Sequence, residues 1–464
     1  MKRFSALFGA ILALVPAPRQ DRPLTAWERE ARDRLRELVE INTTESVGSS
    51  AAAARAMAAR LKAAGFADSD VVVIEHAPRK GNLIARLRGR DPTRKPIVLL
   101  SHLDVVEAKP EDWTLPPFQF IEKNGVFYGR GVADDKDEGA IGITNLIRMK
   151  TEKYVPDRDI VVALTADEEG GPNNGVEWIL ANRPELFRAE FVFNEGGGGR
   201  VRAGRKLSHD LQASEKKVLN LELEVTNPGG HSSVPVKDNA IYHLAGALVK
   251  IGAYDFPVRL NEITRTYFAK SADVGGGPMG AAMRAIAANE TDTAAIRMLA
   301  SDARYNSQLR TTCVATMLDG GHARNALPQR ARATVNCRIL PDESAADVQR
   351  ALEQVVADPQ VRFRTLGETR DSPPSPLPAD LFREVERVSR GLWPDLPVIP
   401  TMSTGATDGA YLRNAGIPTY GVSGLFYDNP NAHGMNEQIP AEGFYQGLEF
   451  MYRLVKSLTG GGTA

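Results

Sequence analysis

The sequence lacks the features that mark several large classes of protein. Only two of its 464 residues are cysteines, so the chain is not a disulfide-rich scaffold. Lys and Arg total 57 against 58 Asp and Glu, a formal net charge of -1, and this balance argues against nucleic acid or a membrane surface as a partner. No repeats are found. The composition indicates a globular protein long enough for two domains.

Long apolar runs are also missing, except at the N-terminus. Lys2 and Arg3 precede an apolar stretch, Phe4 to Val15, which is followed by small residues and prolines. This order is typical of a secretory signal peptide, and the stretch is too short to cross a bilayer comfortably. We expect residues 1–20 to be the signal, and the protein to be exported to the periplasm or medium without membrane attachment after its removal. An uncleaved anchor or a mis-assigned start codon is the alternative.

The two cysteines, Cys313 and Cys337, fall at like-facing positions of two strand-like runs. Strand register cannot be read from a single sequence, so their spacing does not fix a pairing. We expect two free, buried cysteines. A cross-strand disulfide, formed in an oxidising compartment, is the alternative.

The first half of the chain alternates short apolar runs with helical patterns. The strand-like runs lie at 71–75, 82–87, 96–101, 159–165 and 190–193. The helical patterns lie at 26–40, 50–64, 139–152 and 176–187. Near-continuous apolar strands between helices predict an α/β fold, a mostly parallel sheet covered by helices.

Near residue 217 the period changes to strict alternation, as in Leu219, Leu221 and Leu223. Alternation predicts antiparallel strands with one wet face. We therefore expect a smaller α+β domain, 215–368, inserted into a main domain that is made of 21–214 and 369–464.

Metal-ligand side chains follow several of the predicted strands. They are His102 and Asp104, Asp134 and Asp135, Asp167 to Glu169, Glu195, and His433 on a late loop. In an open α/β sheet, ligands gather at the carboxyl ends of the strands. Each motif alone is a weak signal, but together they predict a metal site. Mixed imidazole and carboxylate ligands suit zinc, with cobalt or manganese as substitutes.

The motifs SHLDVV, WTLPPF, GRGVADDK, DEE, NEGG, PGGHSS and NAHG occur in this order. In this the chain resembles the dizinc aminoacylase/carboxypeptidase family from about residue 30 to 455, and most of all its branch of carboxypeptidase S and secreted N-acyl amino acid hydrolases. The resemblance implies a zinc-peptidase fold with two Zn²⁺ ions per subunit (Co²⁺ or Mn²⁺ being possible). It also implies that 215–368 is a lid and dimerisation domain, and that the protein is a homodimer.

The same resemblance assigns the metal ligands. Asp134 would bridge the two ions, with His102 and Glu195 completing one site and Glu169 and His433 the other. Asp104 would hold the second nitrogen of His102 and so fix its tautomer. The peptide bond that follows the bridging aspartate is cis in this family, which implies a cis bond between Asp134 and Asp135.

Glu168 is the acid left without a metal, and we assign it as general base toward a water shared by the two ions. Its neighbour Asp167 is expected to be a solvated or capping acid. The resemblance also implies that His231, in NPGGHSS, would reach a partner subunit's active site and stabilise the oxyanion, which requires a dimer or a large lid closure.

Three further residues resemble those that hold the substrate carboxylate. Asn325 and Arg338 would form a lid pair for it, because an arginine can grip a carboxylate with two parallel hydrogen bonds. Arg338 could equally be a solvated charge on a strand. Gly405 would offer its backbone to the same carboxylate, and Asp408 would order the loop.

The predicted function is zinc-dependent cleavage of an amide bond adjacent to a free carboxylate. The main hypothesis is a carboxypeptidase or dipeptidase acting on short peptides. An N-acyl amino acid deacylase is the alternative, and a non-catalytic metal-binding homologue is a distant third. The segment 256–310 is longer than in smaller relatives and is expected to reshape the pocket.

Overall fold

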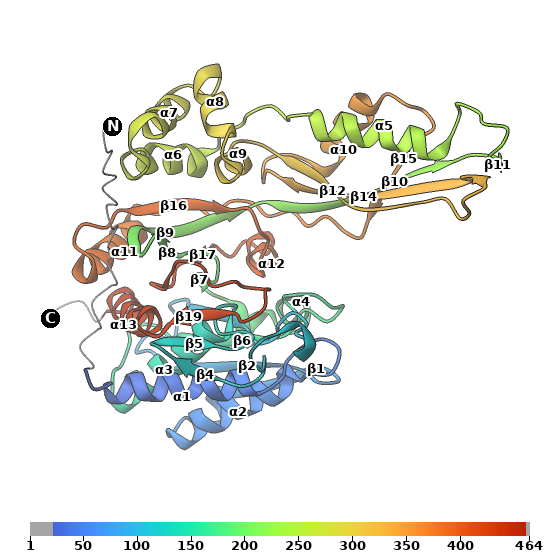
Figure 1. Cartoon of the computed structure of the whole chain (residues 1–464). Helices are drawn as coiled ribbons and strands as arrows, with labels where there is room; N and C mark the ends of the chain where they lie inside the picture. The colour runs from blue at the N-terminus through green and yellow to red at the C-terminus, as the bar shows by residue number, and fades with distance from the viewer. Residues whose placement is uncertain (1–21, 461–464) are drawn as a thin grey trace, which may run out of the picture.

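The computed structural model describes residues 22–460, so the predicted signal peptide, 1–20, lies outside the described residues. The largest part of the fold is a ten-stranded mixed sheet with strand order β1-β2-β6-β3-β7-β17-β9-β8-β18, in which β16 pairs with β9 (Figure 1). Its strands are β1 Val71–Ala77, β2 Lys80–Leu87, β3 Ile97–His102, β6 Ile160–Thr165, β7 Phe191–Asn194, β8 Gly198–Arg202, β9 Arg205–Glu215, β16 Val398–Ser403, β17 Thr419–Gly421 and β18 Phe426–Tyr427.

The centre of this sheet is parallel and fully buried. Every residue of β3 and β6 is buried, as expected for near-continuous apolar strands covered on both faces. β3 pairs in parallel with β6, His102 lying opposite Thr165, and also with β7. The three strands therefore end at one edge of the sheet. The prediction of a mostly parallel α/β fold is confirmed.

Helices cover both faces of the sheet, and a small sheet flanks it. The helices are α1 Ala26–Glu40, α2 Ser50–Ala63, α3 Lys136–Thr151, α4 Gly175–Asn182, α11 Ala379–Leu392, α12 Gly409–Asn414 and α13 Ala441–Leu458. The small sheet consists of β4 Ile121–Lys123, β5 Val126–Tyr128 and β19 Gln438–Pro440. A capping box between Thr25 and Glu28 fixes the start of α1 at the predicted residue. Within residues 22–460, no helix combines the length and the apolar character that a membrane span needs.

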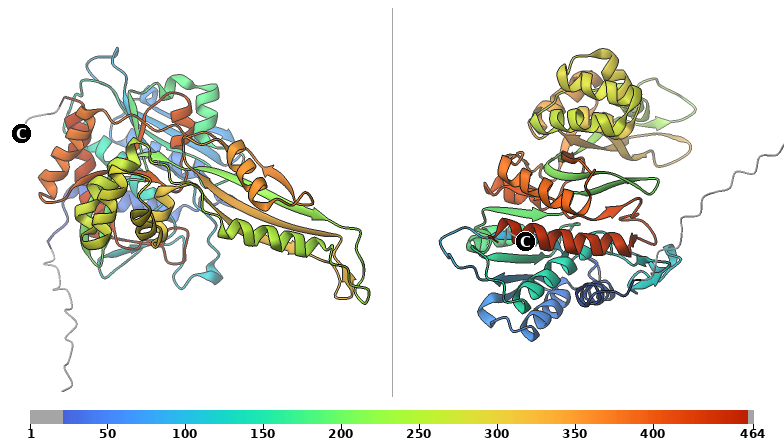
Figure 2. Two further views of the ribbon diagram at one scale, coloured as in Figure 1. Left: turned by 90° about the horizontal axis from the view of Figure 1, so that it is seen from above. Right: turned by 90° about the vertical axis from the view of Figure 1, so that its left-hand side faces the viewer.

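A second sheet, with strand order β12-β14-β10-β15, extends from the first as an arm (Figures 1 and 2). Its strands are β10 Lys217–Thr226, β12 Thr312–Gly320, β14 Arg330–Ile339 and β15 Arg362–Leu366, and the helices α5 Ala240–Ala253 and α10 Ala345–Val356 complete this arm. Leu219, Leu221, Leu223 and Val225 are buried while the residues between them are not, so the predicted alternation is confirmed. The short strands β11 Gly230–His231 and β13 Ala326–Leu327 pair at the far tip of the arm.

Four helices within 215–368 pack apart from the arm. They are α6 Glu262–Gly275, α7 Gly277–Ala288, α8 Thr293–Ala300 and α9 Ala303–Leu309. Their apolar side chains form one cluster with Ile399 of β16, and α6 packs on β16 and β9 of the large sheet. Figure 1 shows them above β16, at the end of the molecule opposite the tip of the arm.

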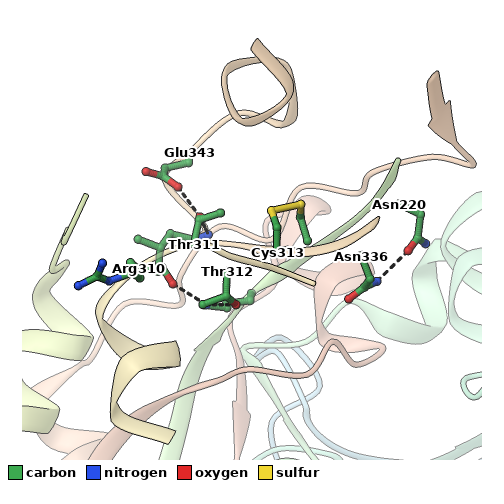
Figure 3. The surroundings of a disulfide bond; sticks show 10 residues. Asn220, Arg310, Thr311, Thr312, Cys313, Asn336 and Glu343 are labelled. Carbon is green, nitrogen blue, oxygen red and sulfur yellow. Dashed lines mark hydrogen bonds between the residues drawn. A yellow bond between two sulfur atoms is a disulfide. The ribbon is translucent and has the colours of Figure 1, made fainter. Parts of the chain in front are cut away.

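The expectation of two free cysteines is wrong. Cys313 of β12 and Cys337 of β14 lie directly opposite each other in the ladder and form a disulfide (Figure 3). One step along the same strand, Asn336 donates a hydrogen bond to Asn220 of β10 at 2.7 Å. The pairing follows from the register of the two strands, and register depends on contacts with the rest of the sheet that spacing along the chain does not reveal.

The disulfide should stabilise the arm. It closes a segment with a sequence separation of 24 residues. Constraining the unfolded chain over such a length is worth about 3 kcal/mol. Replacing both cysteines by alanine should lower the free energy of unfolding by about this amount. Denaturant unfolding of oxidised wild type, reduced wild type and the double variant measures it. Equal stability of oxidised and reduced wild type would contradict the expectation.

Candidate metal centre

The predicted metal ligands come together at the carboxyl edge of the large sheet. His102 is the last residue of β3, Glu169 follows β6 and Glu195 follows β7. Asp134 stands in the turn that leads into α3, and His433 lies in the loop before β19. Five separate segments therefore meet at one place. Sheet topology explains this for the first three residues, because parallel strands end at the same edge.

The donor atoms form two groups that share Asp134. One is His102, Asp134 and Glu195, the other is Asp134, Glu169 and His433, and within each group the donor atoms lie within 4.8 Å of one another. Asp134 Oδ1 lies 3.0 Å from Nε2 of His102, and Asp134 Oδ2 lies 3.0 Å from Nε2 of His433. Each oxygen of one carboxylate thus faces a different histidine, which is the arrangement of a bridging ligand.

The electrostatics of this cluster fit bound cations. Hydrogen bonds to Asp134 and Glu169 raise the pKa of His433 to about 10. Burial raises the pKa of Glu195 well above its ordinary value. Burial also opposes ionisation of Asp134, but hydrogen bonds from both histidines outweigh it and keep the pKa of Asp134 below its ordinary value. One imidazole and two carboxylates per group is a donor set that suits zinc.

The turn that carries Asp134 has the expected backbone. The peptide bond between Asp134 and Asp135 is cis. Asp135 is buried, and its carboxylate accepts a hydrogen bond from the backbone N–H of His102 at 3.2 Å. Asp135 therefore ties the start of α3 to the end of β3, a role that the sequence did not indicate.

Asp104 acts differently from the expectation. Nδ1 of His102 bonds the backbone oxygen of Asp104 at 2.9 Å, whereas the Asp104 carboxylate is 3.8 Å away from it. That carboxylate instead accepts hydrogen bonds from the backbone N–H groups of Glu168 at 3.1 Å and Glu169 at 2.9 Å. Asp104 thus orients His102 through its main chain. Through its side chain it fixes the acidic turn, residues 167–169.

The expectation that Asp167 is a solvated or capping acid is wrong. Its side chain is buried, and Nζ of Lys80 donates to it at 2.5 Å. Lys80 is itself buried and also contacts Glu45. A φ of 59° at Asp167 directs the chain into the left-handed region at this turn. The counter-charge comes from β2, about 87 residues earlier, so the local sequence could not show it.

Glu168 remains beside the donor groups without being part of either. Within residues 22–460 its carboxylate makes no hydrogen bond, while its backbone is fixed by Asp104. Burial, followed by the negative charge of Glu195, raises its pKa well above the ordinary value. A carboxylate of raised pKa in such a place can accept and return a proton.

Sequence reasoning missed a buried ion pair that connects the loops carrying Asp134 and His433. Nη1 of Arg130 donates to Glu437 at 2.7 Å, and both residues are buried. Glu437 also accepts from the backbone N–H groups of Gly131 at 3.1 Å and Ala133 at 2.8 Å. Arg130 further donates to the carbonyl oxygen of His433 at 3.4 Å. The loops that carry Asp134 and His433 are thereby joined to each other.

The residues predicted to contact the substrate do not lie together within one chain. Exposed His231 is the second residue of β11, and Figure 1 shows this strand at the far tip of the arm. The carbonyl oxygen of Asn325 accepts a hydrogen bond from the backbone N–H of Ser232, the next residue, at 3.0 Å. Arg338 is at the other end of β14, opposite Val218 near the start of the arm. The length of that strand separates Asn325 from Arg338 by roughly 25 Å, so the two do not form a pair within one chain.

Arg338 and Gly405 lie nearer the large sheet than His231 and Asn325 do. Arg338 is half-buried and has no acidic partner among residues 22–460, and burial lowers its pKa. Gly405 is exposed on the loop after β16, where its N–H bonds Ser403 at 3.0 Å. Asp408 is buried and accepts from Asn174 at 2.6 Å, so it orders this loop as expected.

Comparisons with known proteins agree with this centre. The profile described as Peptidase family M20/M25/M40 matches residues 98–457. The human N-fatty-acyl-amino acid synthase/hydrolase PM20D1 is 27% identical over 383 residues, which cover 80% of this chain and 76% of that protein. Probable carboxypeptidase S-like 2 of Dictyostelium discoideum is 28% identical over 389 residues, covering 81% of this chain and 74% of that protein.

Solved structures share the fold. The M20 family metallo-carboxypeptidase Sso-CP2 from Sulfolobus solfataricus superposes with a TM-score of 0.69 at 18% identity, covering 92% of this chain and 98% of its own. Human carnosine dipeptidase 1 gives 0.67 at 16% identity, covering 93% and 96%. The family profile spans most of the chain. All five donor residues, from His102 to His433, lie within the residues that it matches. This chain belongs to peptidase family M20/M25/M40.

Proposed function

We propose that this protein is an exported, zinc-dependent hydrolase that cleaves an amide bond next to a free carboxylate, as a carboxypeptidase or dipeptidase on short peptides. The observation that carries the proposal is the pair of donor groups sharing Asp134, with the unbonded carboxylate of Glu168 beside them. A non-catalytic homologue is disfavoured, because no predicted ligand is missing from the centre.

The metal ions, held by His102, Asp134 and Glu195 and by Asp134, Glu169 and His433, would polarise the substrate carbonyl and make a water molecule acidic. Glu168 accepts the proton of the attacking water on its carboxylate and passes it to the leaving amine. Asp104 keeps Glu168 in place, since it holds the backbone on either side of that side chain.

Substrate binding is proposed to involve two subunits. Arg338 and Gly405 would hold the substrate carboxylate from within the chain, and His231 and Asn325 of a second copy would complete the site. Two features support a homodimer: β12 is an edge strand of the arm, and α5 packs beside it. The two elements expose large apolar side chains, namely Ile241, Tyr242, Val249, Val314, Met317 and Leu318.

Deacylation of N-acyl amino acids is the second candidate function. It is supported by the similarity to PM20D1, an N-fatty-acyl-amino acid synthase/hydrolase, whereas the carboxypeptidase S-like relatives and carnosine dipeptidase support peptide cleavage. Activity of the zinc-loaded protein on a panel of dipeptides and N-acyl amino acids separates the two. Absence of metal-dependent turnover on every amide would contradict both.

Export is proposed from two observations. Residues 1–20 have the pattern of a signal peptide, and the disulfide between Cys313 and Cys337 is of a kind that persists in oxidising compartments. The boundaries 21–214 with 369–464 for the catalytic domain, and 215–368 for the lid and dimerisation domain, are part of the same proposal.

The division of roles between neighbouring acids gives a direct test. Glu168→Gln should lower kcat at least about 100-fold while zinc content stays unchanged, because the side chain moves protons and binds no metal. Glu169→Ala should lose bound zinc, because it removes a donor from the group with His433. Elemental analysis and steady-state kinetics measure both effects. Equal loss of zinc in the two variants would contradict the assignment.

The two-subunit site can be tested by mixing inactive variants. Glu168→Gln lacks the base and His231→Ala lacks the residue given to the partner, so each homodimer should be inactive. A mixed dimer holds one site with an intact Glu168 and a partner's intact His231. Refolding or exchanging equal amounts should restore roughly a quarter of wild-type activity, because half of the dimers are mixed and half of their sites are complete. A mixture as inactive as its components would contradict the proposal.

A further inference from the structure

A cavity of about 440 Å³ opens directly beside the metal centre. Asp134 and Glu195 are among its lining residues, so a substrate held at the centre would have access to this space. Asn325, Arg338 and Gly405 do not line it. The residues proposed to hold the substrate carboxylate therefore lie elsewhere, and the cavity is available to the other side of the scissile bond, the acyl side.

The wall next to Glu195 is backbone rather than side chain. It is formed by four successive glycines, Gly196 to Gly199. A Cβ at Gly197 would lie 1.9 Å from the carbonyl oxygen of Gly421, and one at Gly199 would lie 1.9 Å from the Phe426 ring. The segment packs too closely for larger residues. This part of the lining therefore presents backbone to the cavity, next to the donor Glu195.

Two arginines from different elements also line the cavity. Arg304 of α9 lines the cavity, and so does Arg200 of β8. Arg200 is held by Asp210 at 2.6 Å, and its guanidinium lies 5.3 Å from the centre of the Tyr267 ring of α6. The segment 256–310, expected from the sequence to reshape the pocket, thus contributes one side chain to this cavity and supports another.

The two arginines that line the cavity differ in their partners. Arg200 and Asp210 neutralise each other. The carboxylate of Asp428, also on the wall, accepts a hydrogen bond from the backbone N–H of Gly204 at 2.9 Å. The guanidinium of Arg304 has no acidic partner among residues 22–460, so its five N–H donors are available to a ligand.

We propose that this cavity binds the acyl side of the substrate, and that Arg304 selects an acyl group that ends in a carboxylate over an alkyl chain of the same length. A guanidinium binds a carboxylate through two parallel charge-assisted hydrogen bonds, whereas an alkyl chain would desolvate it without compensation. The inference rests on the proposed amidohydrolase function and adds the substrate class: a dicarboxylic acyl group, or a peptide whose residue before the scissile bond is acidic.

Two matched pairs of substrates test the inference. N-glutaryl and N-pentanoyl derivatives of one amino acid share a five-carbon chain, and N-suberoyl and N-octanoyl derivatives share an eight-carbon chain. In at least one pair, wild type should favour the dicarboxylic member in kcat/KM. Arg304→Ala should lower kcat/KM for the dicarboxylic member about tenfold, as expected for loss of one charge-assisted contact. It should leave kcat/KM for the alkyl member unchanged. Arg304→Glu should reverse the preference.

Arg297→Ala is the matched control, since Arg297 is an exposed arginine of the neighbouring α8 that does not line the cavity. It should leave all four values unchanged. Calorimetric binding of the same compounds to zinc-loaded Glu168→Gln protein, with and without Arg304→Ala, measures selectivity apart from turnover. An equal effect of Arg304→Ala on both members of each pair would overturn the inference. So would tighter binding of the alkyl members by Glu168→Gln protein that retains Arg304. Selective binding without any turnover in wild type would instead overturn the proposed function.

Discussion

One carboxylate shared between two histidines organises this protein. The oxygens of Asp134 face His102 on one side and His433 on the other, each at 3.0 Å, and the remaining acidic donors gather around them. Partly buried carboxylates so close together repel one another and lose part of their hydration, so bound cations make the arrangement favourable. The rest of the fold can be understood as the means of keeping these five segments in place.

Three kinds of contact hold the five donor segments in place. The parallel register of β3, β6 and β7 brings their ends to one edge. Backbone N–H groups of the acidic turn bind Asp104, and Lys80 neutralises Asp167 at its base. The ion pair of Arg130 with Glu437 joins the two loops that carry Asp134 and His433. None of the side chains that make these contacts is a metal donor, yet each limits how far a donor can move.

The sequence predicted the parts of this arrangement that are local or repeated. Helix α1 has a capping box and a regular apolar face, and β10 alternates strictly, so both were predicted close to their observed bounds. The donors were identified from motifs in a fixed order. The residues that hold the donor loops in place were not, because Lys80, Glu437 and Asp135 act across tens or hundreds of residues through contacts that have no local pattern.

Errors arose where the tertiary register decides the outcome. The disulfide depends on β12 and β14 pairing with Cys313 opposite Cys337, and Asp167 turns inward because a lysine from β2 lies beneath it. The joint role of Asn325 and Arg338 stays a prediction, because the two lie toward opposite ends of β14 and do not meet within one chain. This separation is what the proposed two-subunit site requires, in which a second copy would supply His231 and Asn325.

The central claim is that two metal ions share Asp134. Anomalous diffraction at the zinc edge, from crystals of the zinc-loaded protein, tests it most directly. We expect two ions per chain, one bound by His102 and Glu195, the other by Glu169 and His433, with one oxygen of Asp134 on each. A single ion, or two ions of which either does not contact Asp134, would contradict the claim.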